Sequence, residues 1–293
     1  MSNETPFRRL AIIGTGLIGG SFGLALRKHF PAISVVGFDH TEIAARAVAR
    51  GAVQEAAATI RDAVLGADLV YVALPIRASL DALPAISAAM YAKALVTDAS
   101  STKALICRMA RFLISSPALF LGGHPMAGKE RSGIENADPD IFVGAPYALI
   151  GSEAGADPRA LSFAELLRRI GAKPVWCDAE THDWAVSIVS HMPQLVALAL
   201  ARVVQDETDE TGLPLRLAGK GLQDMLRLAG SPYEVWRDIF LTNGENITHA
   251  LDRLVQAIDH LRTNLSSKEL EGEFRAANSL FELLQKNQQK SQS

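Results

Sequence analysis

Two short polar segments follow apolar runs in the middle of the chain, and they carry side chains suited to acid–base chemistry. The run ALVTD leads into the segment DASSTK, and the run LFLGG leads directly into His124. If both runs are strands of one parallel sheet, their carboxyl ends meet at the edge where open α/β sheets bind ligands. His124 is therefore the first candidate for a general base, with Ser101 as a hydrogen-bond partner that fixes its tautomer. The alternative role for Ser100 and Ser101 is an N-cap of the following helix.

Two further side chains are candidates for substrate contact. His191 lies in the segment SHMPQ, where Pro193 interrupts an apolar helical pattern. It either lines a cleft or pairs with backbone groups that the proline frees. Arg227 lies among apolar residues in QDMLRLAG. Its guanidinium either reaches solvent or meets an anion, and the fork geometry suits a substrate carboxylate.

The N-terminal segment predicts a dinucleotide site. The apolar run LAII continues into Gly14, Gly16 and Gly19 of a GxGxxG pattern, and a helical pattern follows at once. In such a unit the first glycine permits the tight turn, the second admits a pyrophosphate, and the third lets the helix pack on the strand. We expect the phosphates at the helix N-terminus, next to the free N–H groups around Leu17 and Ile18.

An acidic residue indicates which nucleotide binds. Asp39 ends the second apolar run, ISVVGFD, at the distance from the glycines where a carboxylate accepts hydrogen bonds from the adenosine ribose. The same carboxylate repels a 2′-phosphate, so NAD is favoured over NADP. Leu74 and Pro75, at the end of the third apolar run, complete the expected cofactor contacts. The alternative is a structural βα turn in an unrelated α/β protein, with Asp39 only ending a strand.

Apolar runs alternate with helical patterns up to about residue 177, which is typical of a parallel sheet with helices on both faces. The expected strands are residues 10–14, 33–38, 68–74, 94–98, 119–123, 146–151 and 173–177. After Asp178 long helical patterns follow, the first of them apolar around much of its circumference. The sequence thus predicts an α/β fold: a Rossmann-type doubly wound sheet over residues 1–179, then an all-helical domain over residues 180–293.

Composition narrows the function classes. The 293 residues carry a formal net charge of −3 and no run of Lys or Arg, which argues against a nucleic-acid partner. We find no signal-like opening segment and no apolar run long enough to cross a bilayer, and so expect no membrane partner and a cytoplasmic location. Cys107 and Cys177 form no CxxC arrangement, so neither a disulfide framework nor a cysteine-ligated metal site is expected. A small-molecule substrate fits best.

Taken together, these motifs resemble the prephenate and arogenate dehydrogenases of tyrosine biosynthesis. The resemblance covers nearly the whole chain, through GTGLIGGS, DASSTK, GGHPMAGKERSG, SHMPQ and AGKGLQDMLRLAGSPYEVWRDIFLTN. It implies a homodimer formed through the helical domain. It also implies an oxidative decarboxylation, in which a ring alcohol gives hydride to the nicotinamide while the ring carboxylate leaves as carbon dioxide.

The resemblance also assigns roles to the candidate residues. His124 accepts a hydrogen bond or a proton from the substrate hydroxyl, and Ser101 supports it. Arg227 binds a substrate carboxylate, and His191 lines the same pocket. Glu130 matches a family acid at the entrance of the cleft.

Two departures from the family bear on substrate choice. Prephenate-preferring members often carry a second histidine where this chain has Gln194, and the usual FRDTTR-like segment is here LQDMLR, with Gln223 in place of a basic residue. Prephenate ends in a keto acid and arogenate in an amino acid, so polar groups near that side chain select between them. Losing a cationic residue favours dual use or the use of arogenate.

Two other readings compete with this one. A β-hydroxyacid or 6-phosphogluconate-type dehydrogenase would use a lysine of the helical domain as its acid/base, and Lys220 in AGKG is the comparable residue. A non-catalytic NAD-sensing dimer would not need His124.

Overall fold

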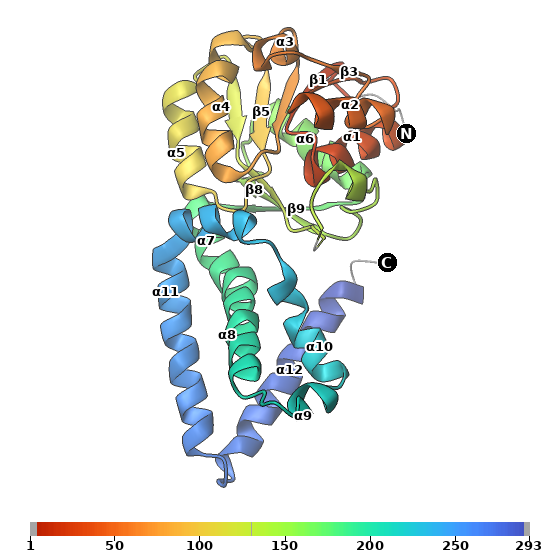
Figure 1. Cartoon of the computed structure of the whole chain (residues 1–293). Coiled ribbons are helices and arrows are strands. Elements are labelled where there is room, and N and C mark those ends of the chain that lie inside the picture. Colours follow the sequence, from red (N-terminus) through yellow and green to blue (C-terminus); the bar gives the residue numbers. More distant parts are fainter. Residues whose placement is uncertain (1–4, 130, 290–293) are drawn as a thin grey trace.

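The computed structural model describes residues 5–129 and 131–289. An α/β body holds the N-terminal part of the chain, and a group of long helices below it in Figure 1 holds the rest. This is the predicted class of fold. The boundary between residues 179 and 180 stays a prediction.

The α/β body is built on a parallel sheet whose strand order is β3-β2-β1-β4-β5-β6. Its carboxyl ends are level, because Ile13 pairs with Phe38 and with Val72, and Val72 pairs with Asp98. The strand order reverses between β1 and β4, which is the position where such sheets bind ligands. The six strands are β1 (Arg9–Ile13), β2 (Ser34–Phe38), β3 (Glu55–Ala56), β4 (Leu69–Val72), β5 (Leu95–Asp98) and β6 (Leu119–Leu121).

Helices cover both faces of this sheet, so its central strands are apolar throughout. Ile12 of β1 is buried with Phe22 and Phe163 on one face, whereas Ile13 is buried with Leu83 and Ile106 on the other. Successive side chains of β1 thus pack into two separate hydrophobic cores, one on each face of the sheet, as a doubly wound sheet requires. The helices of this body are α1 (Leu17–His29), α2 (Thr41–Ala49), α3 (Ile60–Val64), α4 (Ile76–Ala89), α5 (Ala104–Leu113) and α6 (Pro158–Arg169).

The chain leaves the large sheet earlier than the sequence predicts. Strand β6 ends at Leu121, and His124 lies in β7 (Gly123–Pro125), the first strand of a separate three-stranded sheet. Its other strands are β8 (Pro146–Ile150), antiparallel to β7, and β9 (Lys173–Cys177), parallel to β8. The expectation that these last runs extend the one parallel sheet is therefore wrong, because an apolar run does not reveal which strand it pairs with. Figure 1 shows β8 and β9 on the side of the body that faces the long helices.

The C-terminal half contains helices, as predicted. The chain enters it through α7 (Ala179–Val186), the π-helical turn η2 (Ser187–His191) and α8 (Met192–Asp206), which follow one another without a break. Pro193 stands in the first turn of α8, where a missing N–H is tolerated. The remaining helices are α9 (Leu213–Arg216), α10 (Lys220–Leu226), η3 (Arg227–Gly230), α11 (Tyr233–Thr263) and α12 (Glu269–Gln289), and a short 3₁₀ turn, η1 (Ile134–Asn136), lies in the first half.

This unbroken helical run corrects the expectation that no apolar segment is long enough to cross a bilayer. Residues Ala179–Asp206 form 28 residues of helix with a mean hydropathy of 1.5 in their most apolar window, so by length and composition they are able to cross a membrane. Pro193, which the sequence pattern marked as an interruption, lies in the first turn of α8 and does not break the run. Only 28% of that window is buried within the chain.

Two carboxylates of the helical half sit on helix N-termini of the α/β body. Asp183 of α7 accepts hydrogen bonds from the backbone N–H groups of Lys103 and Ala104 at the start of α5, at 2.7 and 2.9 Å. Asp238 of α11 accepts one from the backbone N–H of Arg77 at the start of α4, at 3.1 Å. Unpaired N–H groups and the helix dipole both favour an anion there. These contacts fix the helical half against the carboxyl edge of the sheet.

Candidate active site

The glycine turn has the geometry that a dinucleotide requires. Gly14 has φ +94°, and a Cβ there would lie 2.6 Å from the carbonyl oxygen of Ala73. A Cβ at Gly19 would lie 1.8 Å from the carbonyl oxygen of Gly14, so helix α1 can approach β1 this closely only with glycine. At Gly16 no described atom would come within 4 Å of a Cβ, which leaves open space in front of the turn.

The surroundings of this turn fit the phosphates and ribose of a nucleotide. No side chain of the described residues caps the N-terminus of α1, so the N–H groups at Leu17 and Ile18 face the open space. Asp39 lies at the end of β2, and its carboxylate accepts a hydrogen bond from the backbone N–H of Thr15 at 2.7 Å. Leu74 and Pro75 follow β4, next to Gly14 at the switch point of the sheet.

A chain of hydrogen bonds orients His124. Its Nδ1 lies 2.9 Å from Nε2 of His182, and Nδ1 of His182 lies 2.8 Å from Oδ1 of Asp183. A carboxylate oxygen accepts, so His182 carries a proton on Nδ1, and as a neutral ring it accepts at Nε2. His124 must then donate from Nδ1. Its Nε2 is left with a lone pair, which is the form that accepts a hydrogen bond from a substrate hydroxyl.

Burial keeps His124 in this neutral form. The ring is buried in the middle of β7, and desolvation moves its pKa well below the ordinary value of 6.5. The positive charges that His182, Lys103 and His191 carry when protonated lower this pKa further. An imidazole with this pKa is ready to accept a hydrogen bond at neutral pH.

A buried ion pair holds the strand that carries His124. The ammonium of Lys103 donates to a carboxylate oxygen of Asp98 and, at 2.6 Å, to the carbonyl oxygen of Gly123. The other carboxylate oxygen of Asp98 accepts from the N–H of Gly123 at 3.0 Å. Both charged side chains are fully buried, so each depends on the other for charge compensation. The ends of β5 and β7 are thereby tied together.

His191 occupies the end of the π-helical turn and is 1% exposed. Its Nδ1 lies 3.2 Å from Nδ2 of Asn243, and its ring meets that of Trp236 edge to face. Burial is the main cause that lowers the pKa of His191 to about 4; the Asp183 carboxylate opposes this, and a protonated His182 adds to it. His191 is a neutral ring at physiological pH.

Gln194 lies in α8, one turn after His191, and is also buried. Among the described residues, none donates a hydrogen bond to its Oε1. A buried acceptor without a donor costs free energy unless a ligand supplies one.

The two serines of the DASSTK segment do not make the contacts that the sequence predicts. Ser101 is half-buried on the loop between β5 and α5, and none of the hydrogen bonds of the described residues joins it to His124. The tautomer-fixing contact expected of Ser101 is made by His182. The N-cap alternative for Ser100 and Ser101 is wrong, because the N-cap position of α5 is Lys103 and the capping carboxylate comes from Asp183.

Two more candidate residues, Arg227 and Lys220, lie on the helical half. Arg227 is exposed at the start of η3, which packs against α8. Glu130 lies outside the described residues. Lys220 is exposed and pairs with Asp224 at 2.8 Å, so it has no place in the site around His124.

Four residues that organise the site were not among the candidates from the sequence: His182, Asp183, Lys103 and Asn243. His124 and His182 are 58 residues apart, and Asn243 is 52 residues from His191. A usable signal was the adjacent His-Asp pair at the start of the helical patterns, directly after the last strand.

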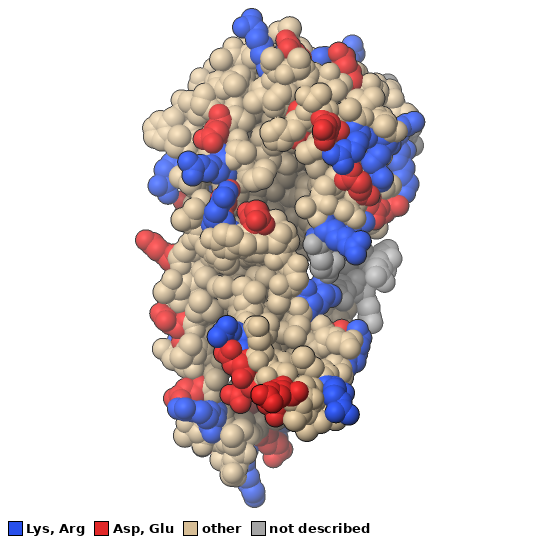
Figure 2. Space-filling model, viewed as in Figure 1, with Lys and Arg blue, Asp and Glu red and all other residues tan. Residues whose placement is uncertain are grey.

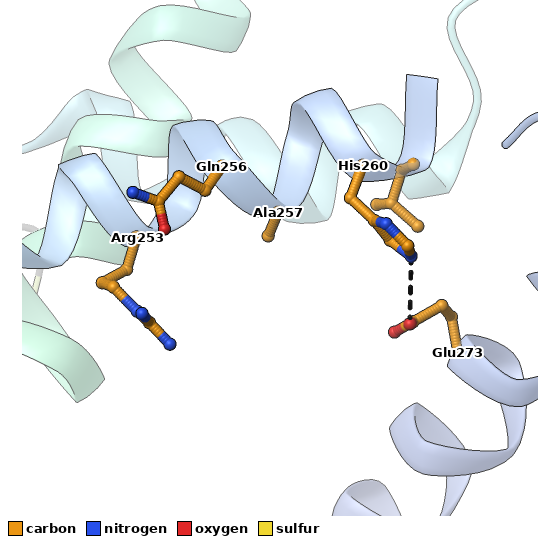
Figure 3. Close-up of a pocket in the computed structure, with 6 residues that line it drawn as sticks. Arg253, Gln256, Ala257, His260 and Glu273 are labelled. Carbon is orange, nitrogen blue, oxygen red and sulfur yellow. Dashed lines mark ion pairs between the residues drawn. The ribbon is translucent and has the colours of Figure 1, made fainter. Parts of the chain in front are cut away.

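Other candidate sites are weaker. Within residues 5–129 and 131–289, no group of three or more His, Cys, Asp or Glu is arranged to hold a metal ion. Cys107 is a buried free thiol whose pKa burial raises to about 12, so it is not a reactive thiolate at neutral pH. Figure 3 shows a pocket between α11 and α12 whose polar contact is the ion pair of His260 and Glu273 at 3.5 Å.

A glycine turn at the switch point, a neutral imidazole at the carboxyl edge and a helical half fixed against that edge define a two-domain nucleotide-dependent dehydrogenase. The comparisons identify the family. A family model described as the prephenate dehydrogenase nucleotide-binding domain matches residues 22–176, and one described as the prephenate dehydrogenase dimerization domain matches residues 178–286. The chain belongs to the prephenate dehydrogenase family.

Three relatives illustrate the likeness. Prephenate dehydrogenase of Bacillus subtilis is 32% identical over 268 residues, which is 91% of this chain and 72% of the relative. The structure of prephenate dehydrogenase from A. aeolicus in complex with hydroxyphenyl propionate and NAD+ has a TM-score of 0.80 at 28% identity and covers 96% of this chain and 98% of its own. Synechocystis arogenate dehydrogenase has a TM-score of 0.75 at 29% identity, covering 96% and 99%.

Proposed function

We propose that this chain catalyses the NAD-dependent oxidative decarboxylation of prephenate, of arogenate, or of both, giving 4-hydroxyphenylpyruvate or tyrosine. The family membership and the relatives that act on these two substrates support the reaction class. The observation that carries the proposal is the imidazole of His124, held as a neutral acceptor at the edge where the nicotinamide of a bound dinucleotide would lie.

The residues provide what this reaction needs. Bound NAD supplies the hydride acceptor. As hydride leaves the ring carbon that bears the hydroxyl, the hydroxyl becomes more acidic, and Nε2 of His124 accepts its hydrogen bond. The electron pair of the breaking bond to the ring carboxylate completes the aromatic ring, and carbon dioxide leaves. The phenol product keeps the hydroxyl proton, so His124 ends the cycle in the neutral form in which it began.

The substrate is oriented by the side chains around His124. We assign Arg227 to a substrate carboxylate, because a guanidinium on a segment that packs against α8 is near the helix that carries Gln194. His191 and Gln194 contact the side chain of the substrate, and Ser101 supports His124 from the neighbouring loop. Glu130 belongs to the cleft entrance on the strength of the family resemblance alone.

We assign NAD as the preferred cofactor. The fit of the residues around Gly14, Gly16 and Gly19 supports dinucleotide binding, and the Asp39 carboxylate supports NAD over NADP through repulsion of a 2′-phosphate. This preference is separable from the reaction itself, since a change at Asp39 leaves the groups around His124 in place.

We further propose that two copies pair through their helical halves. Apolar side chains are exposed along α8, α11 and α12, among them Val203, Val255, Leu280 and Phe281, and the dimerization-domain match covers these helices. Figure 2 shows a broad uncharged area on this half of the molecule. A second subunit that covers α7 to α8 accounts for their apolar surface without a bilayer, which supports a cytoplasmic location.

The direct test is a steady-state assay of NADH formation with each substrate and each cofactor. Turnover of prephenate or arogenate with NAD, with one carbon dioxide released per NADH, is the expected result. Absence of turnover of both substrates by a folded, NAD-binding protein would refute the proposal.

A further inference from the structure

Asn243 makes two contacts that fix the state of His191. Its Nδ2 lies 2.7 Å from the main-chain oxygen of Asp183 and 3.2 Å from Nδ1 of His191. A main-chain carbonyl only accepts hydrogen bonds, so the side-chain atom of Asn243 that faces it is the nitrogen. That nitrogen has two hydrogens, one for each neighbour.

The tautomer of His191 follows from this assignment. An amide nitrogen only donates, so Nδ1 of His191 accepts and carries no proton. The ring is buried and neutral, and its single proton is therefore on Nε2. His191 therefore donates from its Nε2, whereas His124 accepts at its Nε2.

The backbone is irregular at both ends of this contact. Asn243 has φ −132° and ψ 22° inside α11, which is a break in the helical geometry, and His191 ends the π-helical turn. Such departures from a regular helix occur often at functional positions. Asn246, one turn further along α11, donates from Nδ2 to Oδ1 of Asn243 at 2.8 Å and holds the amide in this orientation.

We propose that Asn243 is a positioning residue that holds His191 as a neutral Nε2–H donor to an oxygen atom of the substrate, opposite in polarity to the acceptor His124. The part that concerns the substrate rests on the proposed function. The class of group recognised is a carboxylate or carbonyl oxygen, which accepts a hydrogen bond, and not an ammonium, which donates.

The first test needs no change in the site. The holoprotein with NAD, labelled with ¹⁵N-histidine, is studied by NMR between pH 6 and 8, and the His191 signals are assigned by their loss in His191→Gln. The expected spectrum shows Nδ1 as a bare ring nitrogen and Nε2 as a protonated one. Exposed His260, beside Glu273, serves as the internal reference for a histidine ring outside the site. A proton on Nδ1 of His191 would overturn the proposal.

The second test uses a matched pair of variants on α11. Asn243→Leu removes the donor to His191 at similar volume, and the Thr248→Val control removes a hydrogen bond of the same helix, from Thr248 Oγ1 to the main-chain oxygen of Gly244 at 2.9 Å, without touching the ring or the Asn243 amide. We expect Asn243→Leu to mix the two tautomers and to raise the substrate KM about three- to tenfold, as the loss of one neutral hydrogen bond does. The control keeps the wild-type tautomer and KM within about twofold.

The outcomes separate the two proposals. If Asn243→Leu does not fold, the wild-type spectrum alone decides the tautomer. A variant with mixed tautomers and an unchanged KM would overturn the role of His191 as a donor to substrate. A wild-type protein that shows the expected tautomer but turns over neither substrate would refute the proposed function and leave the positioning by Asn243 supported.

Discussion

The Nδ1 of His124 donates its hydrogen bond to Nε2 of His182, 2.9 Å away on a different half of the molecule. His124 belongs to a short strand of the α/β body and His182 to the first helix of the C-terminal half. The imidazole of His124 therefore takes its orientation from the docking of the two halves. Asp183, which both orients His182 and caps α5, links this docking to the orientation of His124.

Replacing His182 tests this link. In His182→Phe the ring volume remains but Nε2 is lost, so His124 no longer has a fixed acceptor for its Nδ1 proton. We expect kcat to fall about 10–100-fold, less than the full contribution of about 10²–10⁴-fold typical of a general base, with little change in NAD affinity. The exposed control His260→Phe should keep the wild-type kcat. An unchanged kcat in His182→Phe would show that the function of His124 does not depend on His182.

The lowered pKa of His191 predicts that the free energy of unfolding depends on pH. The unfolded chain binds a proton near the ordinary value of 6.5, whereas the folded chain binds it only near 4. Between these values the unfolded state holds more protons, so the free energy of unfolding decreases as the pH falls from 6.5 toward 4. Urea unfolding at pH 7.5, 6 and 5 measures this slope. His191→Gln, if it folds, should show a shallower slope; an equal slope would assign the effect to other groups.

From the position of Asp39 we predict a preference for NAD over NADP. Its carboxylate lies at the end of β2 and already accepts the N–H of Thr15, so a 2′-phosphate placed on the ribose would meet a fixed negative charge. We expect a higher kcat/KM with NAD than with NADP in the wild type and a smaller ratio in Asp39→Ser. Equal use of both cofactors by the wild type would show that the ribose is held elsewhere.

From the environment of Gln194 we predict that it favours arogenate over prephenate. Its buried Oε1 lacks a donor among the described residues, and the ammonium of arogenate is a donor that the keto group of prephenate does not offer. We expect Gln194→His to raise the ratio of kcat/KM for prephenate to that for arogenate, with a larger change at pH 6 than at pH 8 if imidazolium charge is responsible. A ratio that stays constant or moves toward arogenate would place the selectivity elsewhere.

The sequence predicts local geometry well and long-range contacts poorly. The glycine turn is local, since Gly14, Gly16 and Gly19 lie within six residues between a strand and a helix, and the structure has the predicted geometry. The position of His124 at the carboxyl edge was also predictable from the apolar run before it. Its strand, however, pairs antiparallel with β8, which the run does not indicate.

The contacts of the orienting residues could not be predicted from the sequence pattern, for a physical reason. His182 and Asn243 act through single hydrogen bonds to rings that are distant in the chain, and a single polar residue in a helix leaves no periodic trace. The π-helical turn before Pro193 is similarly hidden, because one extra residue in a turn leaves the apolar pattern almost unchanged.

The most direct test of the account is the effect of His124→Asn on catalysis and on cofactor binding, measured side by side. Asparagine keeps a polar side chain at the carboxyl edge but removes the imidazole acceptor. The account predicts that kcat with the better of the two substrates falls about 10²–10⁴-fold while the Kd for NAD stays within about twofold of the wild type. A folded variant that loses less than about tenfold in kcat would contradict the role of His124 and, with it, the proposed chemistry of the site.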